Sequence, residues 1–172
     1  MKKSIYLFAI AATSLITMSA CGQDKSKRPS PPAKETVTTT NGATITIDYN
    51  QPSVKGRTIG KEIAAFGEVW RTGANEATTF EVSKDVMIDS KKLPAGKYGF
   101  YTIPGEKEWT IIFNKKTDLW GSNGYKEGED ALRTVSTPIK SAMFTEKMTF
   151  SIAPSGTISL MWGDVKVDFK VN

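Results

Sequence analysis

The sequence predicts an all-β domain, an antiparallel β-sandwich of about eight to ten strands. Three observations predict it. Apolar and polar residues alternate over most of the chain after residue 42, turn-forming residues separate the alternating stretches, and no long segment has helical periodicity. A small β-barrel is the alternative, because strand number alone does not distinguish a closed barrel from a sandwich.

The alternation begins at Ala43 and recurs to the end of the chain. Every second residue is apolar, and most of the residues between are Thr, Ser or charged, as in strands with one buried face. The stretches with this pattern are 44–49, 79–82, 86–88, 98–103, 109–114, 148–152, 157–162 and 165–171. Trp109 and Trp162 lie within clean alternation, so we expect both in the core.

Turn signals lie between these stretches. Pro and Gly occur together at 93–97, 103–106 and 154–156, and the Trp-Gly-Asp-Val segment at 162–165 predicts a tight hairpin turn. The best helical candidate is about one or two turns within 60–66.

Two irregular segments interrupt the alternation. The first runs over 51–57 and on through 66–78, and the second over 116–130. Both are rich in Gly, Trp and charge, and binding sites on β scaffolds concentrate in such segments.

The first 20 residues are typical of a signal peptide. Lys2 and Lys3 precede an apolar stretch over 5–16 that is short for a membrane span. Residues 18–22 (Met-Ser-Ala-Cys-Gly) resemble the lipobox of bacterial lipoproteins, with Met where Leu is more usual. The resemblance implies acylation of Cys21; an ordinary secretory signal is the alternative.

These features predict three parts: a lipoprotein signal peptide (1–20), a lipidated Cys21 with a flexible Pro/Lys/Ser-rich tether (21–42), and one β domain (43–172). Several acyl chains hold a protein stably on a bilayer. We therefore expect a lipid-anchored envelope protein, on the outer membrane and facing the periplasm, whose tether holds the domain off the bilayer.

Composition excludes several kinds of chemistry. The chain has no His and only one Cys, which removes Ser-His-Asp and Cys-His catalysis, His-based metal sites and internal disulfides. The net charge of +5 falls to +3 once residues 1–20 are removed, since 21 basic and 18 acidic residues remain. No basic face is interleaved with aromatic residues, so nucleic acid is not an expected partner. We expect no metal and no cofactor.

Several motifs occur together in the folded part: 48–49 with 52–57, 70–80 (WRTGANEATTF), 93–98, and 103–106 followed by Trp109. In this order they resemble the family catalogued as domain of unknown function 2911, found mainly in Gram-negative envelope proteins. The resemblance covers about 44–171. It implies a secreted or lipid-anchored β domain and no particular activity.

The candidate ligand site combines a stacking ring, cations and directional hydrogen-bonding groups in and around the first irregular segment. Its members are Arg57, Trp70, Arg71, Asn75, Glu76 and Lys97. A structural alternative is an ion pair between Arg71 and Glu76, with Trp70 closing the end of the sandwich. In the second segment, Trp120 and Tyr125 are either a binding platform or a cap on the core.

Three functions fit this sequence. The first is a binding or accessory module for a glycan, a peptide or a small anion. The second is a hydrolase that uses carboxylates such as Glu76 with Asp48. The third is a structural or assembly lipoprotein with a protein partner. The sequence leaves the oligomeric state open, and a binding module is preferred over an enzyme.

Overall fold

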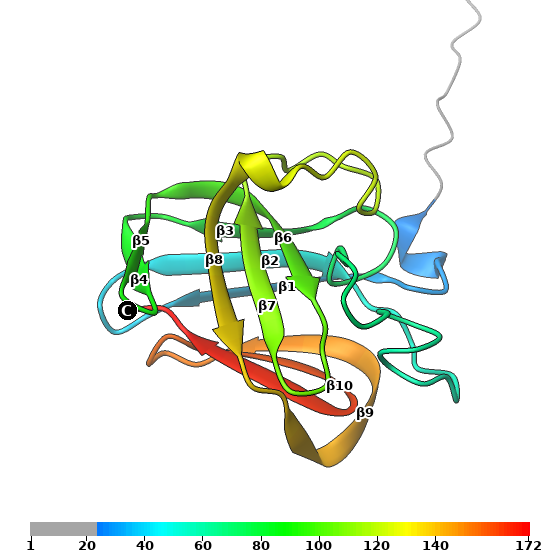
Figure 1. The fold of residues 1–172 in the computed structure, drawn as a ribbon. Helices are drawn as coiled ribbons and strands as arrows, with labels where there is room; N and C mark the ends of the chain where they lie inside the picture. The colour runs from blue at the N-terminus through cyan, green and yellow to red at the C-terminus, as the bar shows by residue number, and fades with distance from the viewer. Residues whose placement is uncertain (1–23) are drawn as a thin grey trace, which may run out of the picture.

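A computed structural model describes residues 24–172; the expected signal peptide and Cys21 lie outside the described residues. The described chain has ten strands, two 3-10 helices and no α-helix (Figure 1). In order they are η1 (Lys25–Lys27), β1 (Pro32–Thr38), β2 (Thr44–Asn50), β3 (Thr78–Val82), β4 (Val86–Ile88), β5 (Lys91–Leu93), β6 (Gly96–Ile103), β7 (Trp109–Asn114), η2 (Glu127–Glu129), β8 (Asp130–Ser136), β9 (Ile139–Ile152) and β10 (Thr157–Lys170). Within residues 24–172, no helix has the length and hydropathy required to span a bilayer.

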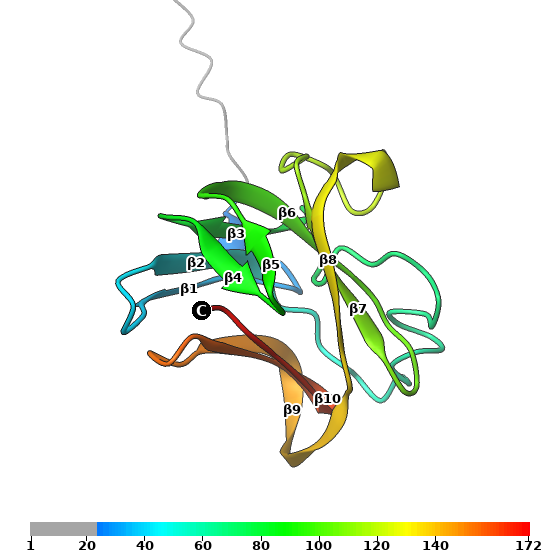
Figure 2. The ribbon, with the colours of Figure 1, turned by 60° about the vertical axis from the view of Figure 1, so that its left-hand side comes forward.

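The strands form two layers. One is a six-stranded antiparallel sheet in the order β1-β2-β3-β6-β7-β8, and the other is the long β9–β10 ribbon that packs against one of its faces (Figures 1 and 2). The short β4–β5 hairpin forms a third sheet. The large sheet keeps β1 and β8 as separate edges, so the fold is a sandwich and not a closed barrel.

Aromatic side chains fill the space between the layers. The ring centroid of Phe100, on β6, lies 5.7 Å from that of Phe150 on β9 and 5.8 Å from that of Phe169 on β10. Trp109 and Trp162 are 2% and 3% exposed, which confirms the sequence prediction for both. Alternate residues of the large sheet therefore face the core, and the others form its outer face.

The expected tether (21–42) includes a strand of the folded domain. Residues 32–38 form β1, which pairs antiparallel with all of β2, from Pro32 opposite Asn50 to Thr38 opposite Thr44. Three prolines and many polar residues obscured this edge strand, whose inward side chains, such as Ala33 and Val37, are only partly buried. The folded domain thus begins well before residue 43.

Two local predictions were wrong. Residues 162–165 continue β10 instead of turning, and Gly163, with φ of 60°, lies where the register with β9 shifts as at a β-bulge. Residues 60–66 form turns closed by a bridge between Ile59 and Ile63, without a helix. The predicted turns at 93–97, 103–106 and 154–156 do connect successive strands.

Candidate functional site

A polar cleft of about 400 Å³ lies against the outer face of the large sheet. Its walls come from the start of β1, the end of β2, the 76–79 segment, β6 and the 117–120 loop. The residues lining it are Lys25, Pro32, Ala33, Asp48, Tyr49, Asn50, Glu76, Ala77, Thr79, Lys97, Thr117, Asp118, Leu119 and Trp120.

Strand register places the floor of this cleft. Asp48 on β2 is opposite Thr79 on β3, and Thr79 is opposite Gly99 on β6. A Cβ at Gly99 would lie 2.2 Å from the backbone oxygen of Lys116, so the loop that follows β7 passes directly over this glycine. Because residue 99 is a glycine, the loop can lie close to the sheet, and this loop forms the adjoining wall of the cleft.

Trp120 is the most exposed tryptophan, with 60% of its surface accessible. A bridge to Glu76 positions it, together with backbone hydrogen bonds from Ala77 to Leu119 and from Gly121 to Asn75. On its other side is a second hollow of about 540 Å³, lined by Asp24, Lys27, Arg28, Pro29, Asn75 and Trp120. Trp120 therefore borders two polar hollows and does not cap the core.

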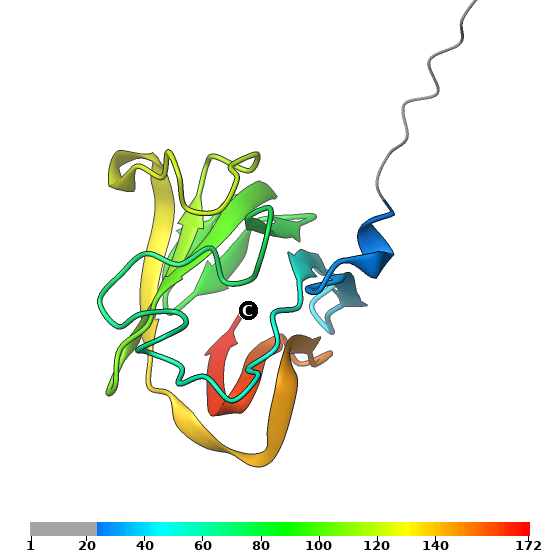
Figure 3. The same ribbon diagram turned by 90° about the vertical axis from the view of Figure 1, so that its right-hand side faces the viewer.

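The residues before β1 form an N-terminal strap, defined as residues 24–31, that lies beside the sheet (Figure 3). Nη1 of Arg28 donates to both carboxylate oxygens of Glu76 at 3.0 Å, and Nζ of Lys25 lies 3.1 Å from Oε1 of Glu76. Nδ2 of Asn75 donates to the backbone oxygen of Ser30 at 3.2 Å. The loop that contains Asn75 and Glu76 thus holds the strap against the domain.

These contacts determine the ionisation of Glu76. Desolvation by burial acts to raise its pKa, but hydrogen bonds from its own backbone N–H, from Arg28 and from Lys25, with the charge of Arg28, lower the pKa to about 2. Glu76 is therefore an anion at neutral pH whose oxygens are occupied by the strap.

The strap contact makes stability depend on pH. Because the folded-state pKa of about 2 lies below the ordinary value of 4.5, ionised Glu76 stabilises the fold above pH 4.5, and this contribution is lost as the pH falls through 2. Glu76→Gln should lower the free energy of unfolding by about 1 kcal/mol at pH 7, since the pair is partly exposed. Thermal unfolding of both proteins from pH 7 to pH 2 should show their difference shrinking. Glu81→Gln, at an exposed position on β3, is the control; a constant difference between wild type and Glu76→Gln would contradict this role.

The predicted site residues do not all lie at the cleft. Trp70 stacks on Trp162, with ring centroids 5.2 Å apart and planes 12° apart, and its Nε1 donates to the backbone oxygen of Gly73. Arg57 donates to the backbone oxygens of Ser53 and Val54 and does not line the cleft. The structure brings Glu76 and Lys97 into the cleft and Asn75 into the adjacent hollow.

The ion pair between Arg71 and Glu76 that was the structural alternative does not form among the described residues, because Glu76 pairs with Lys25 and Arg28 instead. Arg71 is partly buried near Gly121, and its Nε has no hydrogen-bond partner within residues 24–172. Burial lowers the pKa of its guanidinium. Trp70, in contrast, does close the end of the sandwich, as the structural alternative predicts.

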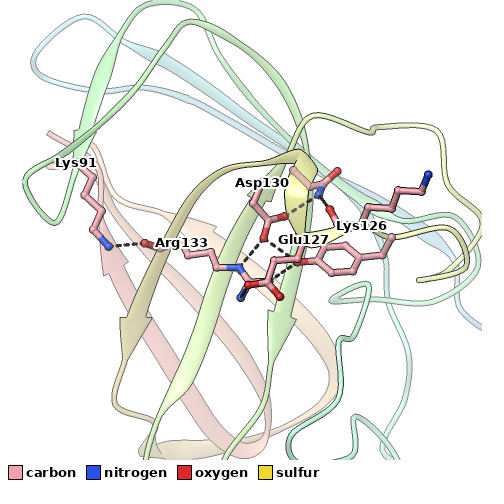
Figure 4. A network of polar contacts seen from close by, with 7 residues as sticks. Lys91, Lys126, Glu127, Asp130 and Arg133 are labelled. Atoms are coloured by element: carbon pink, nitrogen blue, oxygen red, sulfur yellow. Dashed lines mark hydrogen bonds and ion pairs between the residues drawn. The ribbon is translucent and has the colours of Figure 1, made fainter.

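A polar network anchors the loop that carries Trp120 (Figure 4). Asp130 accepts hydrogen bonds from Nε of Arg133 at 2.5 Å, from the Tyr125 hydroxyl at 2.8 Å and from Nδ2 of Asn114 at 2.7 Å. Burial and the hydrogen bond to Asp130 raise the pKa of Tyr125 to about 12. Tyr125 is therefore a structural residue that holds the far end of the loop.

Sequence reasoning did not assign Asp118, Lys25 or Arg28 to a ligand site, and it left Trp120 undecided. The Gly-rich segment around Trp120 was an indication of a binding loop in the sequence. Lys25 and Arg28 had no such indication, because they are distant from Glu76 in the sequence and contact it only in the folded chain. Between residues 24 and 172, no group of three or more Asp, Glu, His or Cys side chains is arranged to hold a metal ion.

A family model described as protein of unknown function (DUF2911) matches residues 30–171. The chain belongs to the DUF2911 family. The match begins just before β1, so β1 is part of the DUF2911 domain, whereas Lys25 and Arg28 precede the matched region. No curated protein and no solved structure matches this DUF2911 chain.

Proposed function

We propose that this DUF2911 protein is a membrane-anchored envelope module that binds a polar ligand in the cleft beside Trp120. One observation carries the proposal: Trp120 is 60% exposed between two polar hollows, while Trp70, Trp109 and Trp162 pack together inside the fold. A large ring left open to solvent beside a cleft is a typical anchor for a ligand.

The groups around the ring favour a glycan. Trp120 offers a flat apolar face for a sugar ring, Asp118 and Asp48 offer carboxylate acceptors for hydroxyl groups, and Lys97 offers an ammonium donor. Asp48 already pairs with Lys34 at 3.4 Å, so Asp118 and Lys97 are the more available charges. Peptides and small anions would use the same ammonium group.

The second part of this proposal is the location of the protein in the cell envelope. The lipobox-like residues 18–22 support acylation of Cys21, and several acyl chains would give stable attachment. The residues that follow, Gly-Gln-Asp-Lys-Ser-Lys, are not an acidic cluster of the kind linked to surface export. The protein would then face the periplasm from the outer membrane.

Binding of soluble peptidoglycan fragments tests the cleft. These fragments carry sugar rings, carboxylates and amines, and titration calorimetry of the purified mature chain measures their affinity. Trp120→Ala should weaken binding about tenfold or more, which corresponds to about 1.4 kcal/mol. Neutral oligosaccharides, short peptides and phosphate, titrated separately, show which part of a fragment is recognised.

Phe144→Ala is the matched control, because Phe144 is 64% exposed on β9 and lies outside the cleft. Equal affinity of wild type and Trp120→Ala would refute the site. Loss of binding only in Phe144→Ala would move the site to the β9–β10 ribbon. That ribbon exposes Ile139, Met143 and Phe144, which is the observation in favour of a protein partner as second candidate.

The carboxylate hydrolase finds no support in Glu76. A general acid must carry a proton at neutral pH, and the low pKa of Glu76 leaves its carboxyl group ionised. Its two oxygens are already bound by Arg28 and Lys25. Glu76 therefore acts as an attachment point for the strap.

A further inference from the structure

The N-terminal strap leaves almost no free chain between the domain and the expected lipid. Residue 24 is the first described residue, and only Gly22 and Gln23 separate it from Cys21. Three peptide steps span at most about 10 Å. The headgroup layer on each side of a bilayer is roughly 5–8 Å thick. A strap fixed to the domain therefore places its own surface at the outer boundary of the headgroups.

The strap is fixed at several points along its length. Arg28 and Lys25 bind Glu76, Asn75 binds the carbonyl of Ser30, and the chain then enters β1, which pairs with β2 over its whole length. The backbone N–H of Gln51 also donates to the carbonyl of Pro31 at 2.9 Å. The strap consequently fixes which side of the domain lies next to residue 24.

That side carries groups that suit the headgroup layer. Lys27 is exposed, and Trp120 lines the same hollow as Lys27 and Arg28. Tryptophan concentrates at membrane–water interfaces, and lysine and arginine interact with anionic lipids. In all three ribbon views the bend of β9 lies at the lower edge of the molecule, and η1 lies well above it (Figures 1, 2 and 3). The exposed apolar residues Met143 and Phe144 belong to β9 and not to the strap side.

We infer that the surface formed by the strap and Trp120 is a membrane-docking face, which holds the domain against the headgroups of the bilayer with the β9–β10 ribbon pointing away. The inference rests on the lipid anchor at Cys21 that forms part of the proposed function. The occupant of this face is a phospholipid surface that includes anionic headgroups. The domain lies on the bilayer surface, and no long spacer separates the two. The hollows beside Trp120 then open at the headgroup layer.

Tryptophan quenching in vesicles tests the docking. The acylated mature chain is reconstituted in vesicles of phosphatidylethanolamine and phosphatidylglycerol that contain a lipid with a nitroxide on its headgroup. Trp109 and Trp162 are buried and Trp70 packs against both, whereas Trp120 is 60% exposed. The quenched emission should therefore come from Trp120, and Trp120→Phe should remove it. The double variant Trp120→Phe with Phe144→Trp places the reporter on β9, where we expect no quenching.

A spacer variant tests the role of the short connection. About 20 Gly/Ser residues inserted between Gln23 and Asp24 extend the reach to roughly 25 Å. Headgroup quenching of Trp120 should then be lost, while the protein still floats with the vesicles. Glu76→Gln, which weakens the strap, should cause partial loss, and Glu81→Gln should cause none.

The outcomes separate this inference from the anchor. Vesicle-bound wild type without headgroup quenching, or quenching of the β9 reporter, would each overturn the docking face and leave the anchor standing. Unchanged quenching in the spacer variant would support the docking face and overturn only the role of the short connection. Equal flotation of wild type and Cys21→Ala would overturn both. The titrations with Trp120→Ala test the ligand cleft separately.

Discussion

Replacement of Trp70 by alanine is expected to lower the free energy of unfolding by about 3 kcal/mol. The indole stacks on Trp162 and meets Trp109 edge-on, with a centroid separation of 6.3 Å to Trp109. Its removal leaves a cavity between the two sheets and frees the 66–77 loop from the core. Urea denaturation followed by circular dichroism measures the change.

Trp120→Ala is the matched control for this prediction, because it removes the same side chain from an exposed position. Its effect on stability should stay within about 0.5 kcal/mol. If Trp70→Ala left stability intact and abolished ligand binding, Trp70 would be a ligand platform, and the assignment of roles to the two tryptophans would have to be reversed.

Gly99→Ala is expected to cost about 2–3 kcal/mol and also to weaken ligand binding. The new Cβ would lie 2.2 Å from the backbone oxygen of Lys116 and 2.8 Å from the ring of Tyr101. The carbonyl belongs to the loop that continues to Asp118 and Trp120, so relief of the clash moves one wall of the cleft. Thermal unfolding and calorimetric titration of the same preparation measure the two effects.

Gly128→Ala, in η2, controls for the loss of a glycine, since its added Cβ would have no described atom within 4 Å beyond its chain neighbours. We expect little change in either measurement. A Gly99→Ala protein with wild-type stability would show that the loop lies farther from the sheet than the structure places it. Lower stability with unchanged affinity would show that the wall does not contribute to binding.

Part of this fold is determined by local pattern. Period-two alternation places side chains on opposite faces of a strand wherever the strand pairs. It was therefore enough to predict β2, β3, β4, β6, β7, β10 and the end of β9, together with the burial of Trp109 and Trp162. The pattern did not predict β5, β8 or the first part of β9. Proline and glycine restrict backbone angles locally, so the turns before β6, β7 and β10 were predictable as well.

Other features depend on contacts between distant segments. β1 became a strand because β2 offered an unpaired edge, although its own sequence is typical of a spacer. The partners of Glu76 are Lys25 and Arg28 and not its neighbour Arg71, because the strap returns to the sheet beside it.

Trp70 and Trp120 show the same limit most clearly. Both lie in irregular segments with glycine nearby, yet one packs on Trp162 and the other borders the cleft. By itself, the sequence determined most of the strand pattern and the absence of His, and its single Cys21 is the basis of the proposal that the protein is anchored in the envelope. Only the tertiary structure decided which of the two tryptophans faces solvent, because exposure depends on what the rest of the chain packs against. It also decided that the folded domain begins close to residue 24 and not at residue 43.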